Sequence, residues 1–196
     1  MSQLRREGVL DAAIAILDEY GLADLTMRRL ATSLGVQPGA LYWHFPNKQS
    51  LLGAVADRLL EPVDAPLEAA TWDDQLARLA HRLRDALLSH RDGAELVSAT
   101  YASRLTTSRA RERLVSACLR AGMARADAEL AGYTLLYYVL GQTVDEQSRM
   151  QMDSAGALTE DASPLFENPD ATARFDYGLQ LFVAGVRHTL GDRVRT

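Results

Sequence analysis

The positions of the prolines constrain this fold more than any other feature of the sequence. Prolines occur only at positions 38, 46, 62, 66, 164 and 169, so the long run from Leu67 to Ser163 contains none. Such a run, with apolar residues at three- and four-residue spacing, is typical of α-helices. The alternating β-branched runs bounded by turn residues that a sheet needs are missing. We therefore expect an all-α fold.

Glycines, prolines and capping residues divide the chain into separate helices. Gly21 and Gly35 are expected to end two helices, and Thr26 and Asn47 to cap the two that follow them. The expected helices span residues 3–20, 27–34, 38–44, 48–60, 72–90, 94–101, 107–121, 125–149 and 169–190. Pro62 and Pro66 are expected to mark a boundary between a domain over residues 1–61 and a second over 62–196. Residues 150–167 lack an apolar period and are expected to form a mobile loop, which leaves open whether that loop gates a pocket.

The composition excludes several classes of protein. Apolar residues make up 47% and charged residues 24% of the chain, which is enough to bury a core and too apolar for a disordered protein. The net charge of -5 argues against a polycation that coats nucleic acid, although it allows a small DNA-reading patch. A single cysteine, Cys118, allows no intrachain disulfide and no cysteine-based zinc cluster. No signal peptide or bilayer-length apolar run is found, so we expect a cytoplasmic protein with no membrane partner.

Two of the short predicted helices, residues 27–34 and 38–44, are joined by a tight turn at Gly35. This is the arrangement of a helix-turn-helix. In that motif the second helix enters the major groove of DNA and the first helix crosses the DNA backbone and braces it. Leu41 and Phe45 are spaced to face the core, which leaves the residues around them available to DNA.

Small and polar residues on and near the second helix are suited to DNA. The residues expected to contact it are Arg28, Gln37, Pro38, Ala40, Tyr42, His44 and Lys48. The small residues can approach a thymine methyl and Arg28 can donate to a guanine, whereas Tyr42 and Lys48 are suited to phosphates. The alternative is that residues 42–44 form a packed aromatic cluster. Net charge does not decide between the two, because residues 1–60 carry six Lys and Arg and six Asp and Glu.

These residues also resemble a known family. The segments that resemble the DNA-binding domain of the TetR family of repressors are Leu-Thr-Met-Arg-Arg-Leu-Ala at 25–31, Leu-Gly-Val at 34–36, Leu-Tyr-Trp-His-Phe at 41–45 and Asn-Lys at 47–48. The segments that are similar to the tetracycline-repressor branch of that family are residues 72–74, 87–94, 140–141 and 145–147. The resemblance covers nearly the whole chain.

The resemblance implies a ligand-responsive repressor. It implies a three-helix DNA-binding domain followed by a helical domain that binds a ligand and dimerises, and a homodimer that binds a palindromic double-stranded operator. In this mechanism a small-molecule effector moves the helix at 48–60 and changes the separation of the two recognition helices, which is roughly 34 Å when they fit DNA. The residues expected at the dimer interface are Leu135, Tyr138, Leu179, Phe182, Val183 and Val186. The alternative for this apolar set is packing inside one monomer, and both can hold in part.

Departures from the branch pattern bear on the effector. The resemblance places Val97 where tetracycline repressors have a magnesium-holding histidine, and Leu79 and Leu83 where they have an asparagine and a phenylalanine that grip the drug. Valine cannot ligate magnesium, so we expect a more apolar pocket and an effector other than tetracycline–magnesium, with no metal-ligating residues and no cofactor. The identity of the effector, and whether it needs a metal, are left open. The residues expected to line the pocket are Leu79, Leu83, Val97, Thr100, Tyr101, Leu114, Leu135 and Tyr138. Core packing is the alternative for each of them.

The recognition helix departs from the branch as well, because Gln-Pro-Gly-Ala at 37–40 replaces the base-reading side chains of the tetracycline repressor. We therefore expect a different operator. An enzyme is not expected, since the four histidines are scattered and no nucleophile is paired with a base. The remaining alternatives are a TetR-like regulator without small-molecule induction and a helical binding protein.

Overall fold

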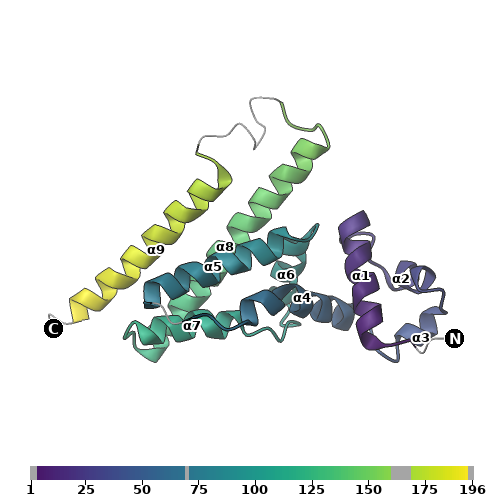
Figure 1. Ribbon diagram of the computed structural model, residues 1–196, viewed down its shortest axis with the longest axis horizontal. Helices are drawn as coiled ribbons and strands as arrows, with labels where there is room; N and C mark the ends of the chain where they lie inside the picture. The colour runs from purple at the N-terminus through teal and green to yellow at the C-terminus, as the bar shows by residue number, and fades with distance from the viewer. Residues whose placement is uncertain (1–3, 69–70, 160–168, 194–196) are drawn as a thin grey trace. The chain divides into compact units, whose positions relative to one another are not determined.

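The computed structural model describes residues 4–68, 71–159 and 169–193, and these residues form helices with no β-strand (Figure 1). Its helices are α1 (Arg6–Tyr20), α2 (Met27–Ser33), α3 (Pro38–Leu41), α4 (Lys48–Asp64), α5 (Trp72–Leu88), α6 (Gly93–Ala102), α7 (Ala110–Arg120), α8 (Arg125–Ser154) and α9 (Ala171–Arg193). The expected all-α fold is confirmed. Two compact units are present. The first is Met1–Glu61 with Ala86–Ser108, and the second is Pro62–Asp85 with Arg109–Thr196.

Apolar residues at helical spacing build the core of the first unit. Val9, Ala13 and Leu17 lie on one face of α1 and are fully buried. Leu30 of α2 joins the same cluster, and so does Leu96 of α6. Burial of a side chain of this size contributes about 1.5–3 kcal/mol. The segment that contains α6 is therefore part of the hydrophobic core of the N-terminal helices, although it follows them by many residues in sequence.

The expected capping residues end and begin helices as the sequence indicates. The Thr26 hydroxyl accepts a hydrogen bond from the Arg29 amide at 3.1 Å, at the start of α2. The Asn47 side chain accepts one from the Ser50 amide at 2.8 Å, at the start of α4. Gly21 closes α1 with a φ of 88°, a left-handed conformation that disfavours a side chain. These local signals are sufficient to set where the first helices begin and end.

Several expected boundaries are wrong. Helix α4 continues through Pro62 to Asp64 although this proline has no amide hydrogen to donate to the Arg58 carbonyl, and Val63 in the same turn is buried. Helix α8 continues to Ser154, so the first five residues of the loop expected over 150–167 are helical. The remaining loop residues from 160 onward and the expected cap Asn168 lie outside the described residues. Asp170 caps α9, since its carboxylate accepts from the Ala173 amide at 2.7 Å.

The second unit is built on the long helix α8, drawn in green in Figure 1. Helix α7 packs closely along α8 where Gly132 meets Val115. A side-chain carbon added at Gly132 would lie 2.6 Å from the Val115 Cγ2 and 3.1 Å from its amide nitrogen. Glycine is therefore required here by the close approach of two helices.

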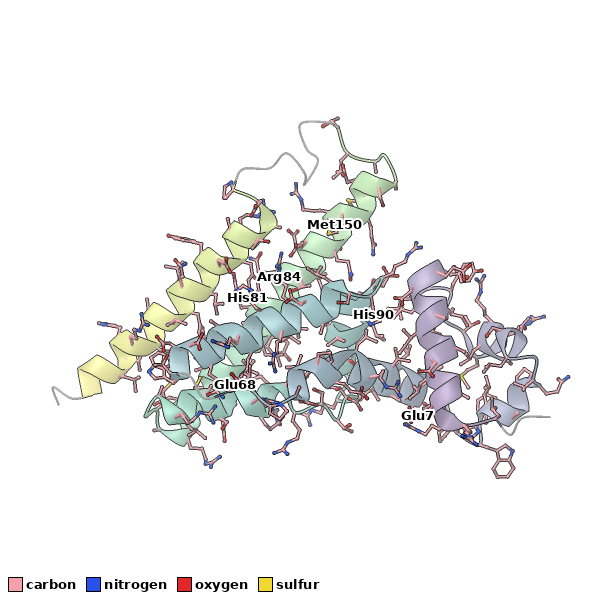
Figure 2. All side chains as sticks on the ribbon, viewed as in Figure 1. Glu7, Glu68, His81, Arg84, His90 and Met150 are labelled. Carbon is pink, nitrogen blue, oxygen red and sulfur yellow. The ribbon has the colours of Figure 1, made fainter. Side chains whose placement is uncertain are left out.

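Helix α9 is held by polar contacts as well as apolar ones. Arg84 of α5 is buried and donates to both carboxylate oxygens of Glu146 on α8, at 2.9 and 2.6 Å. The same guanidinium donates to the Thr172 hydroxyl of α9 at 3.2 Å. The Tyr138 hydroxyl donates to the Phe175 carbonyl at 2.7 Å. His81 and Arg84, labelled in Figure 2, both project from α5 toward α9. No helix in the described ranges is long and apolar enough to span a membrane.

Candidate nucleic-acid interface

Helices α2 and α3 form the helix-turn-helix of the first unit. The turn between them passes through Gly35, which has a φ of 64°. Leu41 and Phe45 are buried and fasten α3 to the core, as expected from their spacing. Helix α3 is shorter than expected, since only Pro38–Leu41 is helical and residues 42–44 continue as a turn. The side of α3 that faces away from the core is exposed to solvent.

The seven residues expected to contact DNA all lie in the first unit. Arg28, Gln37, Pro38 and Tyr42 are exposed, while Ala40, His44 and Lys48 are half-buried. Their proposed contacts with DNA stay predictions. The packed aromatic cluster that was the alternative for residues 42–44 does not form, because Trp43 is 91% exposed and Tyr42 is 49% exposed. Among the described aromatic side chains, Trp43 is by far the most exposed.

Gly39 of α3 and Trp43 of the turn after it are exposed, and neither is among the residues expected to contact DNA. Successive residues of a helix are rotated by about 100°, so Gly39 lies on the side of α3 opposite the buried Leu41. Gly39 is exposed and has no heavy atom within 4 Å of where a side-chain carbon would stand. Trp43 lies in the turn that follows α3 and is 91% exposed. The burial of Leu41 and Phe45 was available from the sequence, and the opposite face could have been read from it.

Ion pairing explains why a neutral segment can face DNA. Arg29 pairs with Asp24 at 2.9 Å. Arg58 pairs with Asp11 at 3.2 Å and Glu61 at 3.0 Å, and it also contacts Glu7. The carboxylates of Asp24, Asp11, Glu61 and Glu7 therefore each have a cationic partner. The basic residues that have no ion-pair partner among the described residues of the same segment are Arg5, Arg6, Arg28 and Lys48. The net charge of the segment stays zero, but these four cations are available to phosphates because no described carboxylate pairs with them.

The residues expected to line an effector pocket are divided between the two units. Leu79, Leu83, Leu114, Leu135 and Tyr138 belong to the second unit, where the leucines are fully buried. Val97, Thr100 and Tyr101 belong to the first unit, and the buried Thr100 hydroxyl donates to the Val97 carbonyl. Burial is compatible with core packing and with a pocket wall, so their role stays a prediction.

Two surface hollows in the second unit are lined by other residues. One, of about 430 Å³, lies between α5 and α9 and contains the ion pair of His81 and Asp176 at 3.1 Å. A hydrogen bond from the Thr71 side chain, together with one from Arg187, lowers the pKa of Asp73 in this hollow to about 2. The other, of about 410 Å³, lies between α7 and α8 beside Tyr133.

Chemically reactive groups are not gathered into one place. Burial raises the pKa of the Cys118 thiol to about 11, which keeps it protonated and unreactive at neutral pH. In the part of the chain that the structure describes, no three His, Cys, Asp or Glu side chains are placed to hold a metal ion.

The residues expected at a dimer interface are mostly covered within the second unit. Leu135, Leu179, Val183 and Val186 are buried there, which corresponds to the packing alternative, and Phe182 is half-buried. Tyr138 is half-buried against Phe175, with ring centroids 5.6 Å apart. The large apolar residues that α8 and α9 expose are Leu130, Tyr133, Tyr137, Met150, Met152, Tyr177 and Leu181. The role of the six expected residues in a dimer interface therefore stays a prediction.

A short outward helix on a braced two-helix motif defines a helix-turn-helix regulator. Two family models match the chain, "Bacterial regulatory proteins, tetR family" over residues 9–55 and "Tetracyclin repressor-like, C-terminal domain" over residues 65–165. The chain belongs to the TetR family, a family of regulatory proteins and not of enzymes.

Its relatives match over nearly their full length. The crystal structure of Mycobacterium smegmatis BioQ is 50% identical, with a TM-score of 0.85 over 94% of this chain and 98% of that one. A crystal structure of BioQ with its natural double-stranded DNA operator is 47% identical, with a TM-score of 0.79 over 94% and 98%. The class A tetracycline repressor protein from transposon 1721 of Escherichia coli is 35% identical over 95% of this chain and 92% of that protein.

Proposed function

We propose that this protein is a homodimeric transcriptional repressor that binds a palindromic double-stranded operator and is released by a small molecule. The observation that carries the proposal is the exposed side of α3, which is braced by the buried Leu41 and Phe45, with the guanidinium of Arg6 lying 4.9 Å from the Phe45 ring centroid. Residues 1–61 would supply the DNA-binding domain. Residues 62–196 would supply the effector-binding and dimerisation domain. The BioQ structure with its operator supports duplex DNA as the partner.

The recognition face assigns different tasks to its residues. Exposed Gln37 and Pro38, with the half-buried Ala40, would read base edges and thymine methyls in the major groove. Arg28 would donate to a guanine, and Tyr42, His44 and Lys48 would contact the backbone and set the register. The operator would differ from that of tetracycline repressors because residues 37–40 differ from theirs.

Dimerisation is supported by the apolar surface that the second unit leaves exposed. Tyr137 of α8 is 51% exposed, and Tyr177 and Leu181 of α9 are 65% and 57% exposed. Exposed apolar residues gathered on helices mark interaction surfaces. A second copy of the chain would cover them, and the expected interface residue Phe182 is partly accessible beside them.

The effector would be an apolar small molecule and not tetracycline–magnesium. The pocket residues proposed above are aliphatic or aromatic apart from Thr100, and Val97 offers no metal ligand. We propose that effector binding shifts α4 and so separates the recognition helices from their two half-sites. Such a shift requires a difference of only a few kcal/mol in operator affinity between the two states.

Selection from a random duplex library tests the proposal. Under it, the protein enriches a palindrome, and its affinity for that duplex falls steeply as salt rises. The Arg78→Ala variant, which loses a cation already paired with Asp74 in the second unit, serves as the control and keeps the affinity. Failure to enrich any duplex would reject DNA binding and favour a helical binding protein. A thermal-shift screen of apolar compounds, with and without magnesium, then tests the effector class.

A further inference from the structure

The carboxylate of Asp57, on α4, is enclosed by hydrogen-bond donors from one short segment. Its Oδ1 accepts from the Thr106 hydroxyl at 2.6 Å, the Thr107 amide at 2.7 Å and the Ser108 amide at 3.0 Å. Its Oδ2 accepts from the Thr107 hydroxyl at 2.6 Å. Asp57 has no ion-pair partner among the described residues, so these four neutral donors alone satisfy the charge. Hydrogen bonds to a charged acceptor are about twice as strong as those between neutral groups.

The contact between α4 and this segment extends one helical turn toward the N-terminus of α4. A side-chain carbon added at Gly53 would stand 2.5 Å from the Leu105 carbonyl oxygen, so the backbones of α4 and this segment meet with no room between them. Gly53 and Asp57 are four residues apart and lie on one face of the helix. Together they fix both the rotation of α4 and its position along the segment 105–108.

The other end of the same stretch of chain is fastened to α1. The two carboxylate oxygens of Asp18 lie 3.1 Å from Nδ1 of His90. The Asp92 carboxylate accepts from the Leu22 amide at 2.7 Å. Residues 86–108 therefore brace α1 at one end and α4 at the other. The helix-turn-helix rests on the core that these two helices share.

We propose that Asp57 is a positioning residue for operator recognition. It touches no proposed DNA contact, and it acts by holding α4 against residues 105–108, which sets the orientation in which α3 is presented. All the residues of this clamp, Gly53 and Asp57 of α4 with residues 105–108, belong to the first unit. This inference rests on the DNA-binding function proposed above.

Substitution of Asp57 distinguishes a positioning role from a purely electrostatic one, because the two roles predict opposite changes in DNA affinity. Asp57→Asn removes one negative charge, which by itself favours DNA binding. It also replaces the charge-assisted hydrogen bonds with weaker neutral ones and forces the Thr107 hydroxyl to accept where it now donates, which loosens the clamp. We expect affinity for the duplex selected by the unsubstituted protein to fall about tenfold, equivalent to the loss of about one charge-assisted hydrogen bond. Affinity for a scrambled duplex is expected to stay within about twofold.

Two further measurements distinguish positioning from general damage. A duplex with one base pair inserted between its half-sites is bound poorly by a protein whose recognition helices are held in place, so Asp57→Asn should discriminate less against it. Thr107→Ser keeps the donor hydroxyl and should retain the unsubstituted affinity, whereas Thr107→Val should share the defect. Thermal melts followed by circular dichroism check that all variants are folded at the temperature of the binding measurement.

Each outcome of the duplex-binding measurements either supports or overturns the positioning role. Equal decreases in affinity for the selected and scrambled duplexes, or no decrease for either, would overturn the positioning role of Asp57 while leaving DNA binding intact. If the unsubstituted protein selects no duplex, the DNA-binding function and this inference fail together.

Discussion

Arg84 and Glu146 form a two-pronged ion pair inside the second unit, with their side chains only 9% and 13% exposed. The guanidinium also lies over the ring of Phe175, with its central carbon 5.2 Å from the ring centroid. The pair joins α5 to α8, and through Thr172 it also reaches α9. A charge buried to this extent is tolerated only while its partner is present.

The Glu146→Gln substitution should therefore leave a buried guanidinium without its counter-charge. We expect the free energy of unfolding, measured by urea denaturation, to fall by about 3–5 kcal/mol. The control is Asp74→Asn, which breaks the exposed pair of Asp74 and Arg78 at 2.9 Å and should cost less than about 1 kcal/mol. Similar decreases in the two variants would contradict a structural role for the buried pair.

The close approach of Gly132 and Val115 predicts a second stability effect. Gly132→Ala places a methyl group against both the side chain and the backbone of Val115, and we expect a destabilisation of about 1–3 kcal/mol from this overpacking. Adding Val115→Ala should recover only part of it, because the backbone atoms stay at 3.1 and 3.2 Å. Gly8→Ala in α1, where nothing lies within 4 Å, should instead leave stability unchanged or raise it slightly. Thermal melts of the three variants test the ranking.

The sequence predicts the fold well where the signals are local. Thr26, Asn47 and Gly21 act within four residues of themselves, and their roles are confirmed. The burial of Leu41 and Phe45 follows from helical periodicity in the same way. Such features depend on neighbouring residues, which a single sequence displays.

Features that depend on distant residues could not be read in this way. The burial of Leu96 with the N-terminal helices arises from packing across many residues, so nothing local signals it. Likewise α8 and α9 carry apolar residues on two faces, and periodicity alone does not say which face the monomer covers. Tyr137 and Leu181 are exposed whereas Leu135 and Leu179 are buried, a difference that arises from tertiary packing.

The unpaired cations of the first unit predict a specific salt dependence. Removing one phosphate interaction reduces the steepness of log affinity against log salt by about 0.9, and a dimer makes every such interaction twice. Lys48→Ala should therefore flatten the slope for the selected duplex by about 1.8, with weaker binding to all duplexes. Arg78→Ala changes the net charge equally and should leave the slope as it is. An unchanged slope in Lys48→Ala would remove this residue from the interface.

The exposed side chain of Leu181 predicts the oligomeric state. If a second copy covers α9, Leu181→Asp introduces a charge into that interface, and light scattering should report a monomer. Operator affinity should then fall at least about 100-fold, because the two half-sites are no longer bound by linked recognition helices. Trp43→Ala removes an even more exposed side chain, at 91%, and should stay dimeric. A Leu181→Asp protein that remains dimeric would show that the copies associate through another face.

Burial of Cys118 predicts both its reactivity and a stability change at high pH. The thiol should react with a disulfide reagent at neutral pH only as fast as the protein unfolds, since the folded protein keeps it protonated and covered. Its pKa is about 11 when folded and 9.0 ordinarily. The unfolded chain therefore loses its proton first, and this contribution to stability is complete below pH 9 and declines between about pH 9 and 11. Cys118→Ala should lack that decline in a comparison of unfolding free energies across this range. Equal pH dependence in the two proteins would mean that the thiol is already accessible in the native state.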